Sequence, residues 1–234
     1  MVKEFFLDLL FPPRCVICDE VTDDKARGVC KACTEKIAYI KPPFCMKCGK
    51  KVMEGGGYCK DCLRREHRFI QGMALYDYAG MSGALYRFKY AGRSEYARFF
   101  GRELAERGGG FLNQIKPDAL VPVPIHASRK RMRGYNQSEL IARELSRHTK
   151  IPVNCDLVTR IKKTLPQREL SESERQNNLK KAFKILQNDV KLSTIVIVDD
   201  IYTTGSTIDA MAEALSGTGV KRIYYMALAI GRGC

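Results

Sequence analysis

The sequence has no long hydrophobic run. The longest apolar stretch near its start, from Phe5 to Phe11, contains Asp8 and runs into Pro12 and Pro13. A helix that crosses a bilayer needs about 20 mostly apolar residues, and a short stretch interrupted by a charge is a poor core for a signal peptide. We therefore expect a cytoplasmic protein without membrane insertion.

Two common nucleotide-binding signatures are also absent. The sequence has no Gly-Lys-Ser/Thr triplet, so a triphosphate-binding P-loop is disfavoured, and no Gly-x-Gly-x-x-Gly follows a predicted strand, which disfavours dinucleotide binding. Histidine is scarce, and His67, His126 and His148 are isolated from one another. Isolated histidines are usually structural or exposed.

What is present is enough for a packed core. The 234 residues are 45% hydrophobic and 9% aromatic, which fits one large domain or two small ones and argues against a disordered chain. Basic residues dominate the charge, because 40 Lys and Arg outnumber 26 Asp and Glu and give a formal net charge of +14.

Eight of the ten cysteines lie before residue 63 and form four Cys-x-x-Cys pairs: Cys15/Cys18, Cys30/Cys33, Cys45/Cys48 and Cys59/Cys62. One pattern is used twice, since eleven residues separate the first two pairs and ten separate the last two. Two residues within a pair let both thiolates face one tetrahedral ion. We interpret the pairs as two structural zinc sites, whose four thiolate ligands leave no open position for catalysis.

Alternatives stay open for these cysteines. One is a disulfide framework, although we expect no secretion signal and therefore a reducing compartment. Others are a single site, a different metal, or an interleaved cross-brace in place of pairing in sequence order. Few large apolar residues lie between the cysteines, so metal must replace a core and its removal should unfold the segment. Two loaded sites would lower the net charge from +14 to about +10.

A second organisation begins after the last cysteine pair, and we place the boundary near residue 68. This predicts a zinc-binding domain at 1–68 and a second domain at 69–234. In the second domain we expect strands at 72–78, 118–123, 156–161, 182–186, 193–198 and 222–229, and helices at 81–91, 94–107, 136–148, 172–178 and 206–216. Gly108, Gly109 and Gly110 are expected to end a helix. The alternation predicts an α/β fold with a mainly parallel sheet covered by helices on both faces.

The stretch IVIVDDIYTTGST, residues 195–207, carries the strongest functional signal. Ligands of open α/β sheets lie at the carboxyl ends of strands, so a strand ending at Val198 delivers Asp199 and Asp200 to that edge. The next loop combines hydroxyls and a glycine at the start of a helix, a seat for a phosphate, and consists of Thr203, Thr204, Gly205, Ser206 and Thr207.

The paired acids restrict what that phosphate belongs to. Asp199 and Asp200 would repel a bare polyphosphate, so they suit ligand hydroxyls or a divalent cation. A sugar phosphate with vicinal hydroxyls satisfies both ends of the motif. The alternative is an ordinary helix N-cap that follows a buried strand with surface acids.

The same residues resemble the phosphoribosyl-pyrophosphate (PRPP) motif of type I phosphoribosyltransferases. This resemblance implies catalytic-site roles for Asp199 and Asp200, which would address the ribose 2′- and 3′-hydroxyls, while Thr203 to Thr207 wrap the 5-phosphate. RGYNQ at 133–137, the pattern of Thr164, Gln167 and Leu170, and the leading cysteine pairs are similar to ComF-type proteins of bacterial natural competence. The similarity covers essentially the whole chain and implies a type I phosphoribosyltransferase-like domain behind a double zinc ribbon.

The resemblance also implies where pyrophosphate binds. It places the pyrophosphate loop at the end of the strand near 118–123, at Pro122, Val123 and Pro124. Basic residues follow, and guanidinium groups pair well with phosphate oxygens: Arg129, Lys130, Arg131 and, as the favoured residue, Arg133. A solvated basic face is the alternative. Magnesium is the expected second metal, because it would clamp pyrophosphate and the ribose hydroxyls.

The polar segment from Thr164 to Asn178 is placed to be the mobile hood that such enzymes close over substrate, with Gln167 and Arg175 as its contacts. Enzymes of this class that salvage 6-oxopurines usually carry an acid where this chain has Thr203. Purine salvage is therefore disfavoured, and the acceptor cannot be named.

Charge points to a second activity. Residues 120–184 hold fifteen Lys and Arg against six Asp and Glu, and such a surface attracts single-stranded DNA. Lys89 and Arg93 are expected to join it. Four aromatic side chains are candidates for stacking on bases, although core packing is their simpler interpretation: Tyr86, Phe88, Tyr90 and Tyr135.

Three hypotheses follow. The first is a phosphoribosyltransferase that binds PRPP with magnesium. The second is a non-catalytic PRPP sensor or DNA-binding component of competence, whose partners would be single-stranded DNA and the DNA-uptake helicase machinery. The third is a zinc-dependent interaction module whose α/β domain is only a scaffold.

Overall fold

The computed structural model describes residues 12–22, 24, 26–161, 182–186 and 191–231. Its centre is a four-stranded sheet of order β1-β6-β5-β2 whose neighbouring strands are all parallel. The strands are β1 (Gly72–Asp77), β2 (Ala119–Pro122), β5 (Thr194–Tyr202) and β6 (Arg222–Ile230). The predicted parallel sheet is confirmed.

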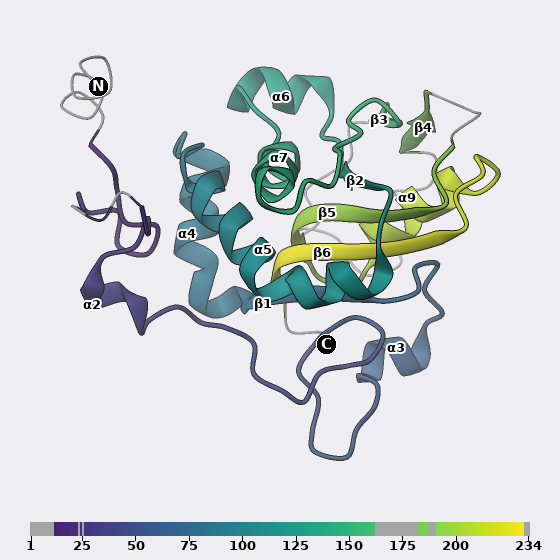
Figure 1. Cartoon of the computed structure of the whole chain (residues 1–234), viewed down its shortest axis with the longest axis horizontal. Helices are drawn as coiled ribbons and strands as arrows, with labels where there is room; N and C mark the ends of the chain where they lie inside the picture. The colour runs from purple at the N-terminus through teal and green to yellow at the C-terminus, as the bar shows by residue number, and fades with distance from the viewer. Residues whose placement is uncertain (1–11, 23, 25, 162–181, 187–190, 232–234) are drawn as a thin grey trace.

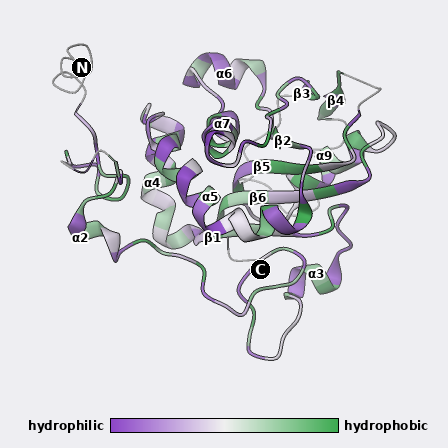
Figure 2. Cartoon of the chain, in the orientation of Figure 1, coloured by the Kyte–Doolittle hydropathy of each residue, from purple (hydrophilic) through white to green (hydrophobic). Residues whose placement is uncertain are grey.

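Helices cover both faces of this sheet (Figure 1). Val196 and Val198 of β5 pack into the core that the first face shares with its helices α4 (Tyr78–Tyr90), α5 (Tyr96–Ile115) and α7 (Gln137–Thr149). The alternate residues Ile195 and Ile197 pack on the second face, against α9 (Ser206–Leu215). Burial on both faces explains why β5 is hydrophobic over most of its length (Figure 2).

The glycine triplet does not end a helix, so that prediction was wrong. Helix α5 runs through Gly108 to Ile115 and ends where Lys116 adopts a left-handed φ of 45°. A Cβ atom on Gly108 would lie 2.3 Å from Cε of Met226, so this glycine lets the helix approach the sheet closely. Packing against β6 outweighs the cost of about 1 kcal/mol that a glycine imposes on a helix interior.

Two further elements differ from the expectation. Strand β5 does not stop at Val198, because Asp199 and the residues up to Tyr202 continue to pair with β6. The basic run after the pyrophosphate loop forms a helix, α6 (Ala127–Arg133), which His126 caps at its start by accepting a hydrogen bond from the Ser128 amide.

The weak strands near 156–161 and 182–186 are confirmed in shorter form. They are β3 (Val158–Arg160) and β4 (Phe183–Ile185), and they form a separate antiparallel pair. The helix expected at 172–178, and the expected hood from Thr164 to Asn178, lie outside the described residues.

The two cysteine-rich segments pack against the α/β domain at different places (Figure 1). The first, with α2 (Lys31–Thr34), lies by α4, where the Arg87 guanidinium donates to the carbonyls of Val16 and Ile17. The second, with α3 (Lys60–Arg64), lies by the sheet, where the Tyr225 hydroxyl donates to the Cys48 carbonyl at 2.6 Å. The boundary near residue 68 stays a prediction.

The segment between the two groups protects an edge of the sheet. Ile40 donates its amide to the Leu75 carbonyl, and Asp77 donates to the Ala38 carbonyl, so residues 38–40 run along β1. A covered edge strand cannot pair with another chain. Within the described part of the chain, no helix has both the length and the apolar character that a bilayer span requires.

Candidate functional site

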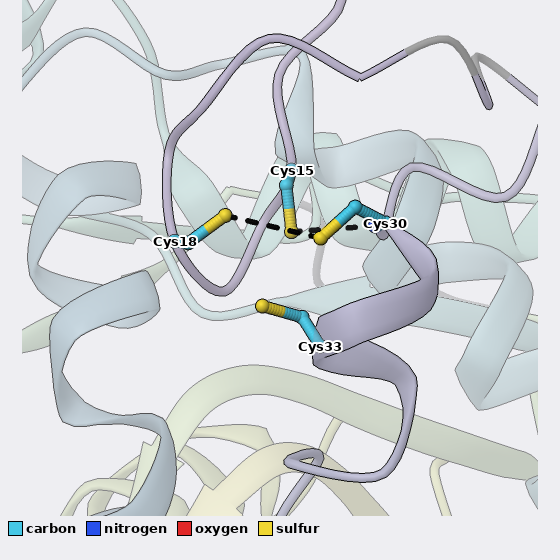
Figure 3. Close-up of side chains that lie close together, drawn as sticks. All are labelled: Cys15, Cys18, Cys30 and Cys33. Carbon is cyan, nitrogen blue, oxygen red and sulfur yellow. Dashed lines mark hydrogen bonds between the residues drawn. The ribbon is translucent and has the colours of Figure 1, made fainter.

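The eight paired cysteines form two groups in sequence order. Figure 3 shows the first, in which four side chains turn toward one point: Cys15, Cys18, Cys30 and Cys33. The second contains Cys45, Cys48, Cys59 and Cys62, and the sulfur atoms of each group lie within 4.8 Å of one another. This arrangement confirms pairing in sequence order and excludes the cross-brace.

The spacing of the sulfur atoms fits zinc. Sγ of Cys18 lies 4.0 Å from Sγ of Cys30, and Sγ of Cys48 lies 3.6 Å from Sγ of Cys59. Tetrahedral zinc with bonds of about 2.3 Å to sulfur separates its ligands by about 3.8 Å. Four thiolates per ion would complete each site, so both sites suit a structural role.

The two aspartates at the end of β5 are held by side chains from two helices. The Ser138 hydroxyl, at the start of α7, donates to Oδ1 of Asp199 at 3.1 Å, and the Asp200 amide donates to the same oxygen at 2.9 Å. Nζ of Lys89, on α4, lies 2.9 Å from Oδ2 of Asp200, with the two side chains only 19% and 12% exposed. Lys89 therefore neutralises an acid of the site and does not extend a basic surface.

The surroundings of the two aspartates favour the neutral form of the Asp199 carboxyl. Burial, followed by the negative charge of Asp200, raises the pKa of Asp199 to about 7, although Lys89 and the two hydrogen bonds oppose the increase. Near neutral pH the Asp199 carboxyl is therefore protonated part of the time. Such a pair can accept hydrogen bonds from ligand hydroxyls or gain charge when a divalent cation binds.

The predicted phosphate loop lies directly after β5. Gly205 has a φ of 81° and is the N-cap of α9, and a Cβ atom there would lie 2.6 Å from the Tyr202 hydroxyl. Glycine is therefore required both for the backbone conformation and for the close approach. The hydroxyls of Thr204 and Ser206 lie 2.8 Å apart. Thr203 and Thr207 flank them and are half-buried, and the first amides of α9 provide the donors that anions use at helix starts.

The pyrophosphate loop of the prediction lies beside the aspartates. Pro122 ends β2, and the Val123 amide donates to the Val198 carbonyl at 2.9 Å, one residue before Asp199. The Asn136 side-chain amide donates to the Val123 carbonyl at 3.0 Å, just before Pro124. Asn136 also caps α7 by accepting from the Ser138 amide, so one residue fixes the loop and the helix start together.

Asn136 and Ser138 were not predicted as site residues. The signal was present, because an asparagine just before an amphipathic helix is typical of an N-cap. What the sequence could not show was that this cap also binds the end of β2 and that Ser138 reaches Asp199.

The basic residues divide between two environments. Arg133, the favoured pyrophosphate ligand, donates to Gln137 Oε1 at 2.9 Å, and its Cζ lies 4.8 Å from the Tyr90 ring centre. Arg160, at the end of β3, was not predicted. Burial, and then the positive charge of Arg129, lower the pKa of Arg160 to about 10, while Asp199 acts in the opposite direction. The charges of Arg129 and Asp199 thus both act on the Arg160 guanidinium.

Two of the predicted contacts cannot be placed in this arrangement. Gln167 and Arg175 lie outside the described residues. Val123, the two aspartates and the predicted phosphate loop lie at or just beyond the carboxyl ends of β2 and β5, as expected for a ligand site of an α/β sheet.

Comparison with known proteins establishes the family. Residues 6–63 match the double zinc ribbon domain, and residues 113–233 match the phosphoribosyl transferase domain. Competence protein F of Haemophilus influenzae is 33% identical over 222 residues, which cover 92% of this chain and 96% of that protein. The chain belongs to the ComF-type family.

Two other relatives also match most of the chain. The DNA utilization protein YhgH of Escherichia coli K12 is 34% identical over 84% of this ComF-type chain and 87% of its own length. Competence protein ComFC of Bacillus subtilis is 30% identical over 82% of this chain and 79% of its own length. The expected combination of a double zinc ribbon with a phosphoribosyltransferase domain is confirmed.

Proposed function

We propose that this ComF-type protein binds PRPP at the carboxyl edge of its sheet, with magnesium, and transfers phosphoribose to an acceptor. The observation that carries the proposal is the continuous strand, loop and helix from Thr194 to Leu215, which puts two acids and a phosphate seat side by side. Ser138 and Lys89 hold the acids from separate helices. A scaffold without a ligand site has no need for either contact.

Each part of the site suits one part of PRPP. The loop from Thr203 to Thr207 offers backbone amides and hydroxyls to the 5-phosphate. Asp199 and Asp200 accept hydrogen bonds from the ribose 2′- and 3′-hydroxyls through their carboxyl oxygens. Lys89 already balances the charge of Asp200, so hydroxyl binding does not leave a carboxylate uncompensated.

The departing pyrophosphate needs positive charge, because C1 of the ribose becomes more positive as the leaving group gains negative charge. Magnesium, held by carboxylate, hydroxyl and phosphate oxygens, supplies the larger part of that charge. The protein's part would come from Arg160, whose charge interacts with Asp199, and from the neighbouring charge of Arg129. Gln167 and Arg175 stay proposed contacts of a hood over the substrate.

A calorimetric titration tests the proposal. Wild-type protein should bind PRPP, and more tightly with magnesium than without it. Asp199→Asn combined with Asp200→Asn should abolish binding. A matched control, Asp118→Asn combined with Asp156→Asn, removes the same charge away from the site and should bind normally. Zinc-loaded, folded wild-type protein that binds no PRPP in either buffer would refute the proposal.

Turnover separates an enzyme from a PRPP sensor. Release of pyrophosphate from PRPP, stimulated by one of a panel of nucleobases or other acceptors, would show transfer. Tight binding without release from any acceptor would favour the sensor, which uses the same residues for recognition alone.

A second candidate function is binding of single-stranded DNA. Tyr86 and Tyr90 on α4 are 59% and 57% exposed, and their ring centres lie 5.1 Å apart. Arg133, the last residue of α6, packs on the Tyr90 ring, and four of the seven residues of α6 are basic. Exposed aromatic rings next to basic residues provide stacking and backbone contacts for single strands. Phe88 is fully buried and Tyr135 is half-buried, so core packing is the better interpretation for those two.

The names of the relatives agree with this candidate, since they refer to competence and DNA utilization. We propose that the chain acts in DNA uptake in the cytoplasm, in contact with helicase machinery. A cytoplasmic location is supported by the two four-cysteine groups, because thiols that bind zinc persist in a reducing compartment.

An oligonucleotide titration tests the DNA surface. Tyr86→Ala with Tyr90→Ala should weaken binding of a fluorescent single strand about tenfold or more, because base stacking contributes roughly 1–3 kcal/mol per base. Tyr58→Ala, which removes an exposed tyrosine from the cysteine-rich region, is the control. Binding should weaken as salt increases. Equal affinities for all three proteins would contradict this surface.

A further inference from the structure

The segment that leaves the second cysteine group, Arg65 to Phe69, passes behind the phosphate loop, and we call it the strap. Nη1 of Arg65 donates to the Thr204 carbonyl at 3.2 Å and to the Ser206 hydroxyl at 3.3 Å. These partners lie 139 and 141 residues away in the chain. A residue of the cysteine-rich region is thus in direct contact with the predicted phosphate seat.

Two further contacts fix the strap to the first turn of α9. Nδ1 of His67 lies 2.8 Å from Oδ2 of Asp209, and the Arg68 amide donates to Oδ1 of Asp209 at 3.0 Å. The His67 side chain is completely buried. A Cβ atom on Gly205 would lie 2.8 Å from Cε1 of His67, so the imidazole forms the wall against which the loop packs.

The strap is also continuous with the second cysteine group through an aromatic cluster. The Phe69 ring lies edge-on to the Tyr225 ring at 4.9 Å, and Tyr202 stacks on Tyr225 at 4.6 Å. The Tyr225 hydroxyl donates to the Cys48 carbonyl. A well-packed chain of contacts therefore connects a metal ligand to Tyr202, which directly precedes the phosphate loop.

We propose that Arg65 is a positioning residue of the phosphate loop and that the second cysteine group, through the strap, controls affinity for PRPP. The inference rests on the proposed binding of a phosphorylated ligand at Thr203 to Thr207. The described contacts of the first cysteine group reach Arg87 on α4, Tyr96 on α5 and Arg93 between them, and not the phosphate loop, so we expect no such role for it.

The geometry of a peptide bond explains how Arg65 acts. In a trans peptide the carbonyl of one residue and the N–H of the next point in opposite directions. Arg65 draws the Thr204 carbonyl toward the strap and thereby turns the Gly205 N–H to the other side of the loop. The glycine would otherwise permit the peptide to rotate, and a ligand would have to order it on binding.

Substitution of Arg65 tests the positioning role. Arg65→Ala should weaken binding of both PRPP and ribose 5-phosphate about tenfold, the size expected for ordering one residue on binding. Arg65→Lys should restore most of the affinity, since an ammonium group can donate to both oxygens. Arg64→Ala removes an exposed positive charge one residue away and should bind as wild type does.

A spectroscopic measurement separates positioning from general destabilisation. The Gly205 amide resonance of the ligand-free protein should move in Arg65→Ala and return toward its wild-type position in Arg65→Lys. An unchanged resonance in Arg65→Ala, or affinity equal to that of wild type, would overturn the assignment. Failure of Arg65→Lys to restore affinity would overturn it as well.

The metal arm uses a matched pair of cysteines, since Cys30 and Cys59 each precede the short helix of their own group. Cys30→Ser and Cys59→Ser should each lower the zinc content, measured by metal analysis, from two ions to one. Only Cys59→Ser should lose affinity for PRPP. Equal affinities in the two variants, whether retained or lost, would overturn the coupling.

The outcomes distinguish this inference from the proposed function. Wild-type protein that binds neither PRPP nor ribose 5-phosphate would remove both. Wild-type protein that binds both ligands, with Arg65→Ala binding them equally well, would remove only the role of the strap.

Discussion

Asp199 should destabilise the ligand-free protein, so Asp199→Asn should make it more stable. Asp199 is half-buried and lies beside Asp200, and this environment raises the pKa of its carboxyl to about 7, from about 3.9 in an unfolded chain. An asparagine keeps an oxygen that can accept from the Ser138 hydroxyl and the Asp200 amide. The substitution therefore removes the charge and retains the hydrogen bonds.

The sign follows from proton binding. Between pH 4 and pH 7 the folded protein holds a proton on Asp199 that the unfolded chain has lost, so stability falls as pH rises, and the penalty is complete above pH 7. The pKa difference corresponds to at most about 4 kcal/mol. Because Asp199 is only half-buried, solvent screens part of this penalty, and we expect Asp199→Asn to gain about 1–4 kcal/mol at pH 8.5, and about 1 kcal/mol less than that at pH 6.

Urea unfolding of zinc-loaded protein, followed by circular dichroism at both pH values, measures this gain. Asp118→Asn is the control with the opposite sign, because the amides of Ser193 and Thr194 donate to Asp118 and lower its pKa. The ionised Asp118 carboxylate stabilises the fold at pH values above the pKa that Asp118 has in the unfolded chain. Asp118→Asn should therefore lower stability at pH 8.5. A destabilised Asp199→Asn, or a gain that is the same at both pH values, would refute the reasoning.

Gly108→Val should lower the free energy of unfolding in urea by about 1–3 kcal/mol, because the valine side chain would collide with Met226. Gly110 lies on the same helix and faces open space, so Gly110→Ala should raise the free energy of unfolding by about 0.5–1 kcal/mol. Equal effects of the two substitutions would contradict the packing of α5. Tyr225→Phe should lower stability by about 1–2 kcal/mol, since it leaves the Cys48 carbonyl without its hydroxyl donor, and no change would show that this bond contributes nothing. Metal analysis should find two zinc ions per chain. A strong chelator should remove both ions and unfold the cysteine-rich region. A cysteine-rich region that stays folded after the zinc is removed would refute a metal-dependent core.

The cysteine groups show where local pattern is sufficient. The spacing within each pair and between pairs predicted two four-thiolate sites, and the structure has them. The cysteine spacing alone left the cross-brace open, because pairing in sequence order and interleaved pairing use the same residues. Only the path of the chain between Cys33 and Cys45, along the edge of β1, decides which pairs meet.

The glycine triplet shows where local pattern misleads. Three consecutive glycines favour a helix end by propensity alone. Gly108 instead faces Met226 and Met73, which leave no room for a side chain. What a glycine faces is a tertiary property, so the sequence could not distinguish a helix stop from a close contact.

By itself, the sequence determined the elements whose chemistry is contiguous. A buried strand, two acids, a hydroxyl-rich loop and a helix follow one another between Thr194 and Leu215, and their order fixes what lies at the edge of the sheet. The cysteine spacing is contiguous in the same sense. Such motifs can be predicted because the residues that act together are joined by a few peptide bonds.

Only the tertiary structure decided which distant side chains control those motifs. Ser138 reaches Asp199 across 61 residues, and Arg65 reaches Thr204 across 139. Lys89 was expected on a basic surface and pairs with Asp200 instead. A charge or a hydroxyl in the sequence has many possible partners, and the packing of α4, α7 and the strap around β5 and its loop selects one of them.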